Sequence, residues 1–222
     1  MNFDIYAINL ERRSDRKENV LDQFKKFDFC NVKIFKAIEH KKGWIGCALS
    51  HLELINHAKK NNLDYIIVVE DDVLMNKLIS PREFKKILYC LTENFDKYDI
   101  FNGSPSFWLK RNNINEIRKR KSFHSKFSFV SGACKTTFMI YTKKSYDQIL
   151  EKYDRLQGKL AIDVFFSENF MQLCYKKYLC YEIRSYSDLQ KHIIDAEQYM
   201  RDQEKIYQSL QEKDCFTKLY DF

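Results

Sequence analysis

The feature that most constrains the fold is an apolar run that ends in consecutive acids. Residues 65–69 read Tyr-Ile-Ile-Val-Val, and Glu70, Asp71 and Asp72 follow at once. A short apolar run rich in β-branched residues predicts a buried strand. Neighbouring carboxylates repel one another and resist removal from water. The triplet is therefore either a solvated turn or a cation site at the strand's carboxyl end, where Mg²⁺ or Mn²⁺ would find the oxygen ligands that they prefer.

Length and composition limit the class of protein. The chain has 222 residues, of which 45% are hydrophobic and 15% aromatic, so it can bury one substantial core. Its seven cysteines are odd in number and lack zinc-site spacing, which argues against a disulfide framework or a structural zinc site. We see no signal-peptide pattern and no apolar run of ~18 residues. We therefore expect a cytoplasmic protein, or one held peripherally on the cytoplasmic face of the membrane.

The net charge of +7 includes one dense basic segment, from Lys110 to Lys126. Three interpretations compete: a solvated loop, attraction to an anionic membrane surface or anionic acceptor, and nucleic-acid binding. No helix-turn-helix, zinc-finger or RNA-recognition pattern accompanies the charge, so we expect no nucleic-acid partner.

Periodicity along the chain predicts alternating strands and helices, which is typical of an α/β sheet with helices on its faces. A capping box predicts a helix start at Ser80, with Pro81 at the first helical position and Glu83 three residues on. We expect one domain over residues 1–195. Residues 196–222 then form an amphipathic helical extension packed on it, with a dimer or membrane-surface role as the alternative. The other expected strands cover residues 3–10, 32–38, 64–69, 98–101, 136–141 and 178–183, and the other expected helices cover 15–27, 45–58, 143–153 and 163–175.

Two polar segments accompany the triplet. Ligands of open α/β sheets bind beyond the carboxyl ends of the strands. The first strand is followed by a turn with three arginines, which is either a set of forked donors for a diphosphate or a charged, solvated turn. The segment Gly43–His51 places glycines around Trp44, which permits close approach of a ligand to the backbone. His51 by itself is more typical of a structural hydrogen bond than of catalysis.

Several segments together resemble glycosyltransferase family 25, the lipooligosaccharide-biosynthesis enzymes related to the collagen galactosyltransferases. The strand and turn over residues 6–16 resemble the family's opening block, and residues 43–51 its second block. Val69-Glu70-Asp71-Asp72-Val73 resembles its metal motif. Residues 131–141 and 162–165 resemble its acceptor-side blocks in the same order.

The resemblance implies a GT-A-like nucleotide-diphospho-sugar transferase fold with a mixed sheet. It also implies transfer of a hexose, typically galactose from UDP-galactose, with inversion. Asp72 is then the principal ligand of Mn²⁺ or Mg²⁺, and Glu70 reaches the metal or the donor ribose. We expect Asp71 to point away from its neighbours, because side chains alternate along a strand. The donor-binding set is Asn9, Leu10, Arg12, Arg16, Ser50, Glu70 and Asp71.

By the same resemblance, Asp163 is the base that an inverting transfer needs. Ala161 stands where the family often has proline, a plain N-cap is the alternative role of Asp163, and Glu168 is the second candidate base. A later residue often completes the metal shell in such folds. His192 is our candidate and Asp188 the alternative, although the family commonly has serine near position 192.

The sequence thus predicts a UDP-sugar-dependent glycosyltransferase that acts on an oligosaccharide or glycolipid acceptor. Two alternatives remain open. One is a nucleotidyl- or phosphoryl-transfer enzyme that uses the same acids. The other is a non-catalytic protein of the same fold that binds sugar nucleotides.

Overall fold

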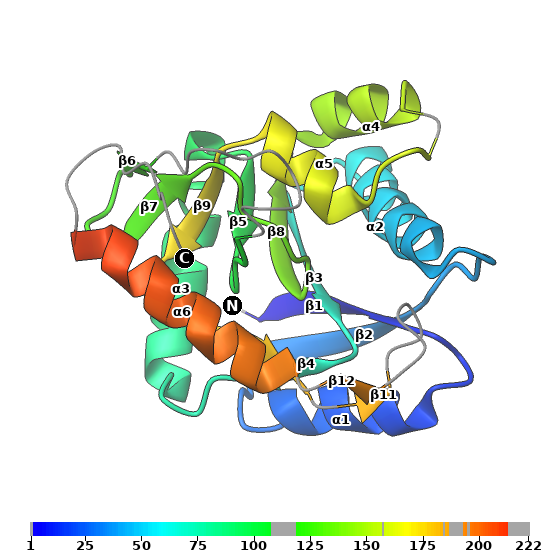
Figure 1. Ribbon diagram of the computed structural model, residues 1–222, viewed down its shortest axis with the longest axis horizontal. Coiled ribbons are helices and arrows are strands. Elements are labelled where there is room, and N and C mark those ends of the chain that lie inside the picture. The colour runs from blue at the N-terminus through cyan, green and yellow to red at the C-terminus, as the bar shows by residue number, and fades with distance from the viewer. Residues whose placement is uncertain are drawn as a thin grey trace.

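The apolar runs at residues 3–9 and 65–70 form neighbouring strands of a mixed sheet (Figure 1). The computed structural model describes residues 2–107, 119–156, 158–183, 185–186, 193–194 and 196–212. Its elements in chain order are β1 (Phe3–Asn9), α1 (Ser14–Phe24), β2 (Cys30–Lys36), α2 (Gly43–Lys60), β3 (Tyr65–Glu70), β4 (Val73–Met75), α3 (Pro81–Thr92), the 3₁₀ turn η1 (Phe95–Lys97), β5 (Ile100–Asn102), β6 (Lys119–Lys121), β7 (Phe127–Val130), β8 (Phe138–Thr142), α4 (Tyr146–Asp154), α5 (Ile162–Asn169), β9 (Gln172–Tyr175), β10 (Cys180–Glu182), β11 (Ser185–Tyr186), β12 (Ile193–Ile194) and α6 (Ala196–Glu212).

The strand order β2-β1-β3-β8-β5-β9-β7-β6 places the ends of several strands at one edge of the sheet. β1 pairs in parallel with β2 and β3, and β8 runs antiparallel to β3 and β5. In this register Ile8 lies beside Glu70, and Asn9 beside Lys36. The carboxyl ends of β1, β2 and β3 therefore meet the beginning of β8, at the kind of edge where open α/β sheets bind ligands.

Helices cover both faces of the sheet, which explains why β3 is apolar at nearly every position. Ile67 and Val69 belong to the buried cluster that includes residues of α1 and α3. Ile66 and Val68 belong to the cluster shared with α2, α4 and α5. The expected class, an α/β fold with a mixed sheet and helices on both faces, is confirmed.

One predicted element is wrong in its second half. The sequence pattern predicts a helix over residues 163–175, but α5 ends at Asn169 and Gln172–Tyr175 form strand β9. All four residues of β9 are buried, and the strand pairs with β5 on one side and β7 on the other. Pairing within the sheet satisfies the backbone of a segment that is buried on both faces, and this outweighs the local helical pattern.

Helix α3 begins as the capping box predicts. The Ser80 hydroxyl accepts a hydrogen bond from the backbone N–H of Glu83 at 3.1 Å, and Pro81 occupies the first turn. This cap sets the start of a helix that contributes Phe84 and Leu88 to the core.

The C-terminal helix α6 lies across β10. Met200 and Tyr207 are buried, and they share a cluster with Phe107, Tyr178 and Tyr181. Among the helices that the structure describes, none combines the length and the hydropathy needed to span a membrane.

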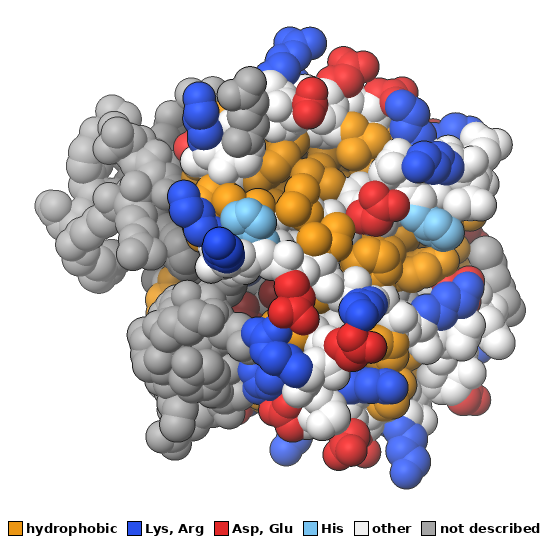
Figure 2. Space-filling model, turned by 90° about the vertical axis from the view of Figure 1, so that its right-hand side faces the viewer, with side chains coloured by type: hydrophobic (Ala, Val, Ile, Leu, Met, Phe, Trp, Pro, Cys, Tyr) orange, Lys and Arg blue, Asp and Glu red, His pale blue; other side chains and the backbone are white. Residues whose placement is uncertain are grey.

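The side of the molecule that carries α2 and α4 exposes hydrophobic side chains (Figure 2). A groove between these helices is lined by Leu49, Leu52 and Leu150. Cys47 and Ser50 of α2 instead line a cleft at the sheet edge. Helix α2 therefore separates this apolar groove from the polar cleft.

Candidate functional site

The acidic triplet lies where β3 ends and the chain turns into β4. Glu70 is the last residue of the strand, and Asp71 and Asp72 form the turn. The expectation that Asp71 points away from its neighbours is wrong for Asp72. Because the alternation of a strand stops at Glu70, the turn places Asp71 Oδ1 and Asp72 Oδ2 at 3.0 and 3.2 Å from the same atom, Nη1 of Arg16.

Asp72 carries the one buried carboxylate oxygen without a hydrogen-bond partner in the described part of the chain. Its Oδ1 is buried and accepts no hydrogen bond. Burial raises the pKa of this carboxyl well above its ordinary value, and the nearby charges of Glu182 and Glu70 raise it further, against the opposing effect of Arg16. An ionised Asp72 is therefore unfavourable here unless a cation reaches its exposed side.

The three arginines of the first turn divide into separate roles. Arg16 contacts the acids, whereas Arg12 forms an exposed ion pair with Glu39 at 2.9 Å and Arg13 pairs with Asp15 at 2.8 Å. Only one of the three thus faces both Asp71 and Asp72 in the contacts that the structure describes.

Asn9, predicted to bind donor, has its side chain inside the protein. Its Nδ2 donates to Asp71 Oδ2 at 2.7 Å and to the carbonyl of Arg13 at 3.0 Å. With its amide hydrogens used in this way, Asn9 positions Asp71 and the arginine turn.

A cleft of about 150 Å³ lies beside these residues. It is bordered by the ends of β1 and β3, the loop after β2 and the first turns of α2. Most of the donor-binding residues expected from sequence line it, namely Leu10, Arg12, Arg16, Ser50, Glu70 and Asp71, together with Asp72.

Ser50 braces one wall of the cleft. The hydroxyl accepts from the backbone N–H of Ile38 and donates to the carbonyl of Gly46, both at 2.8 Å, and the residue is fully buried. A Cβ at Gly46 would lie 2.5 Å from the Ile38 carbonyl oxygen. Gly46 thus permits close approach of the loop after β2 to helix α2. The sequence pattern predicts close approach of a ligand to this backbone instead.

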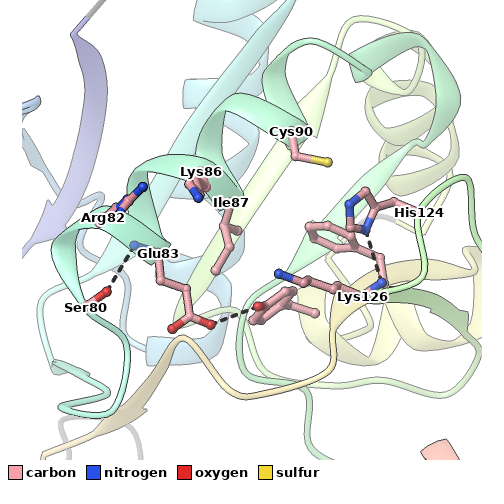
Figure 3. Close-up of a pocket in the computed structure, with 10 residues that line it drawn as sticks. Ser80, Arg82, Glu83, Lys86, Ile87, Cys90, His124 and Lys126 are labelled. Carbon is pink, nitrogen blue, oxygen red and sulfur yellow. Dashed lines mark hydrogen bonds between the residues drawn. The ribbon is translucent and has the colours of Figure 1, made fainter.

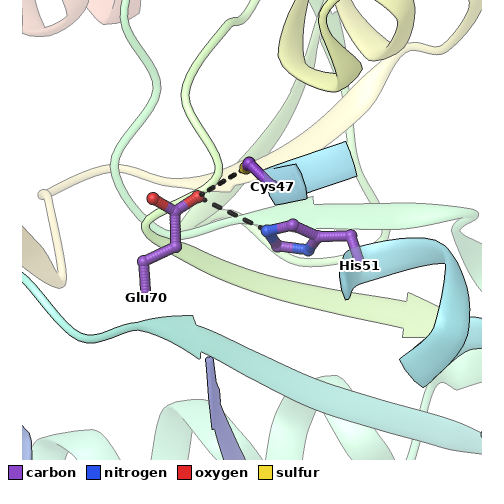
Figure 4. A group of neighbouring side chains, drawn as sticks. All are labelled: Cys47, His51 and Glu70. Carbon is purple, nitrogen blue, oxygen red and sulfur yellow. Dashed lines mark hydrogen bonds and ion pairs between the residues drawn. The ribbon is translucent and has the colours of Figure 1, made fainter. Parts of the chain in front are cut away.

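Glu70 is held by Cys47 and His51 of α2 (Figure 4) and by Thr136, which precedes β8. Its Oε1 lies 3.4 Å from His51 Nε2 and 3.8 Å from Cys47 Sγ, and it also accepts from the Thr136 hydroxyl. His51 Nδ1 lies 2.9 Å from the Tyr141 hydroxyl. A neutral His51 that donates through Nε2 accepts from Tyr141 through Nδ1, so a chain of hydrogen bonds leads from β8 to the carboxylate.

The ligand atoms of Cys47, His51 and Glu70 all lie within 4.8 Å of one another, so this group could hold a metal ion. Burial, followed by the charge of Glu70, raises the pKa of the Cys47 thiol well above its ordinary value. Hard cations such as Mg²⁺ and Mn²⁺ take oxygen ligands rather than sulfur. The group therefore fits a hard ion only through Glu70.

Glu182 and Lys135, which the sequence pattern does not indicate, add one negative and one positive charge near the acidic triplet. Glu182, at the end of β10, accepts from Lys135 Nζ at 2.7 and 2.8 Å and from the Thr137 hydroxyl at 2.9 Å. β10 pairs with β4, so that Glu182 lies opposite Val73, next to the triplet. Lys135 has a backbone φ of 72°, in the left-handed region that non-glycine residues seldom adopt. A lone Glu at the end of an apolar strand was the only sequence signal.

Asp163, in the first turn of α5, lies close to Lys135 of the loop before β8, whose backbone hydrogen-bonds to the Asp163 carboxylate. Its Oδ1 accepts from the backbone N–H of Val164 at 2.9 Å. Burial raises the pKa of Asp163, against the effect of backbone hydrogen bonds from Val164 and Lys135. The N-cap of α5 is Ala161, so Asp163 lies in the first turn and is not a plain N-cap. Glu168 is exposed on the last turns of the same helix.

The predicted later metal ligand, His192, and its alternative, Asp188, lie outside the described residues.

Comparisons with known proteins agree with the resemblance seen in the sequence. A family model described as "Glycosyltransferase family 25 (LPS biosynthesis protein)" matches residues 41–166. Procollagen galactosyltransferase 2 of Mus musculus is 30% identical over 148 residues, and its Homo sapiens counterpart 29%. Each alignment covers 54% of this chain and 23% of the relative, so the chain spans under a quarter of either protein. Among solved structures, apo UDP-glucose pyrophosphorylase aligns with a TM-score of 0.44 and 12% identity, over 93% of this chain and 81% of that one.

Proposed function

Because this chain belongs to glycosyltransferase family 25, we propose that it is a metal-dependent inverting hexosyltransferase. The donor is a UDP-sugar, with UDP-galactose as the first candidate, and the acceptor is a saccharide such as a lipooligosaccharide. The names of the two galactosyltransferase relatives support galactose as the transferred sugar.

The observation that carries this proposal is the buried, unpartnered Oδ1 of Asp72 at the edge of the cleft. Glu70, Asp71, Asp72 and Glu182 bring four carboxylates together, and Arg16 and Lys135 bring two cations. A divalent cation would balance the remaining negative charge.

Asp72 and Glu70 are the residues that would hold Mn²⁺ or Mg²⁺, with His192 as the proposed further ligand. The bound ion would neutralise charge on the diphosphate of the donor as it departs. Oxygen ligands from one or two carboxylates, with positions left for phosphate, are what these ions prefer.

Arg16 is the residue that would bind the donor diphosphate. Its Nη1 contacts both Asp71 and Asp72, so the guanidinium is held at the cleft before any ligand arrives. A guanidinium fixed in this way offers directed hydrogen bonds to phosphate oxygens at little further cost in entropy.

Asp163 is the proposed base. As the acceptor oxygen bonds to the anomeric carbon and the bond to UDP breaks, the ionised Asp163 carboxylate takes the proton of the acceptor hydroxyl. Its raised pKa brings it nearer to the operating pH, which suits proton abstraction better than the pKa of an ordinary aspartate would. The backbone N–H of Val164 holds the carboxylate in place.

A panel of UDP-sugars, incubated with and without Mn²⁺ and analysed for products, tests the proposal. We expect Mn²⁺-dependent release of UDP from UDP-galactose above that from other donors. Release of pyrophosphate from a nucleoside triphosphate would instead indicate nucleotidyl transfer. Binding of UDP-sugars without turnover, in the presence of saccharide acceptors, would indicate a binding protein.

A further inference from the structure

A second cavity lies between α3 and the β7–β9 side of the sheet (Figure 3). It measures about 490 Å³, within the range of roughly 300–1,000 Å³ that is usual for small-molecule sites. Arg82 and Lys86 of α3 line one wall, and His124 and Lys126 line the other. None of these residues borders the cleft beside the acidic triplet.

The basic side chains of the cavity are exposed to solvent and are not paired with its one acid, Glu83. Among the residues that the structure describes, no carboxylate forms an ion pair with Arg82, Lys86 or Lys126. Glu83 is the acid of this lining, and its Oε1 already accepts from the Tyr175 hydroxyl at 2.9 Å, with Lys177 Nζ at 4.0 Å. Cations gathered around one cavity repel each other, and an anion between them would relieve that repulsion.

His124 is oriented so that it can add a hydrogen-bond donor. Its Nδ1 accepts from the backbone N–H of Lys126 at 3.1 Å, so a neutral ring carries its proton on Nε2. The ring also packs edge-on against Phe127, with centroids 5.6 Å apart. These two contacts fix the ring at the wall of the cavity.

Part of the basic segment over residues 110–126 lines this cavity. In the described portion, β6 and β7 pair as an antiparallel hairpin, and His124 and Lys126 lie in its connection. Tyr175 of β9, next to β7, forms the floor and reaches Glu83 of α3. The fold thus joins basic side chains from two distant segments at one concave site.

We propose that this cavity binds a phosphate group borne by a sugar or by a lipid headgroup. A phosphate monoester offers three acceptor oxygens and a charge of about −1.5 to −2. Those oxygens match a guanidinium fork, two ammonium groups and an imidazole N–H arranged around one volume. The inference does not depend on the donor chemistry proposed for the cleft.

Calorimetric titration with glucose 6-phosphate, with UDP present to occupy the cleft, tests the inference. We expect binding that weakens with added salt, and no binding of glucose. Substituting Arg82, Lys86 and Lys126 together by Gln should weaken binding by roughly tenfold or more, the loss expected for charge-assisted hydrogen bonds. The matched control replaces the exposed Lys25, Lys60 and Lys143 by Gln, which removes the same charge away from the cavity.

Vesicles of phosphatidylcholine, with and without phosphatidic acid, separate the two sources of phosphate. Binding to phosphatidic acid vesicles that the cavity variant loses and the control variant keeps assigns the site to a lipid headgroup. Binding of the sugar phosphate alone, with the same pattern of loss, assigns it to a soluble ligand. Absence of binding in both arms, or equal loss in both variants, would overturn the inference.

Discussion

Arg16 donates to Asp72 Oδ2 at 3.2 Å, while Oδ1 of the same carboxylate is buried and accepts no hydrogen bond. The arginine turn after β1 and the acidic turn after β3 are therefore already joined, and one carboxylate oxygen remains for a further cation. We interpret this arrangement as a site for the diphosphate and metal of a sugar-nucleotide donor.

Replacing Arg16 by Gln should weaken donor binding and leave Asp71 and Asp72 without their shared cation. We expect the KM for the donor to rise roughly 10- to 100-fold, the equivalent of a lost charge-assisted hydrogen bond. Steady-state kinetics of UDP release would measure it. The matched control is Arg155→Gln, at the exposed end of α4, for which KM should not change. An unchanged KM in Arg16→Gln would remove Arg16 from the donor site.

Asp163→Asn should lower kcat by about 10²- to 10⁴-fold, the usual contribution of a general base, with little change in donor affinity. Glu168→Gln, on the same helix but exposed, serves as the control and should retain activity. If Glu168→Gln lost activity and Asp163→Asn kept it, the assignment of the base would be reversed.

The raised pKa of Asp163 also predicts a pH profile. The base acts in its ionised form, so kcat/KM should fall as pH decreases through the pKa of Asp163. Because burial raises this pKa above the ordinary 3.8, the acidic limb should lie above that of an unperturbed aspartate. A limb at or below pH 3.8 would contradict the assigned role of Asp163.

The metal-free protein should become more stable when Asp72 is replaced by Asn. Burial raises the pKa of Asp72 in the folded state, so its ionisation destabilises the fold. This destabilisation is absent below the unfolded pKa of about 3.8 and grows as pH rises toward the folded pKa. Urea unfolding in chelator should show a gain in stability at pH 7 that disappears near pH 4. The control, Asp22→Asn on the exposed side of α1, should show no such pH-dependent gain.

The ion pair between Lys135 and Glu182 should matter more to stability than a surface pair. Both side chains are largely buried, at 20% and 11% exposure. Lys135→Met or Glu182→Gln alone should cost about 3 kcal/mol, because each leaves a buried charge unpaired, and the double variant should recover part of this loss. Lys33→Met, which breaks an exposed pair with Asp4, should cost less than about 1 kcal/mol. Equal losses from the two pairs in thermal unfolding would contradict this reading.

The features that could be predicted from sequence are those encoded locally. The strand at 65–69 and the cap at Ser80 follow from short-range patterns, and both occur in the structure. The local pattern predicts helix at Gln172–Tyr175, where the strand conformation depends on pairing with β5 and β7. Glu182 cannot be identified from a local pattern either, because its proximity to the triplet arises from the pairing of β10 with β4. The orientation of Asp71 does not follow from strand alternation, because the strand ends at Glu70 and Asp71 already lies in the turn.

Mn²⁺ binding shows whether Asp72 holds the metal of a sugar-nucleotide donor. Electron paramagnetic resonance can measure free Mn²⁺ during titration of the protein in the presence of UDP. We expect the wild-type chain to bind Mn²⁺ together with UDP, and Asp72→Asn to weaken this binding by roughly 10-fold or more, as loss of a charged ligand should. Mn²⁺ binding of equal strength in the wild type and in Asp72→Asn would contradict this expectation.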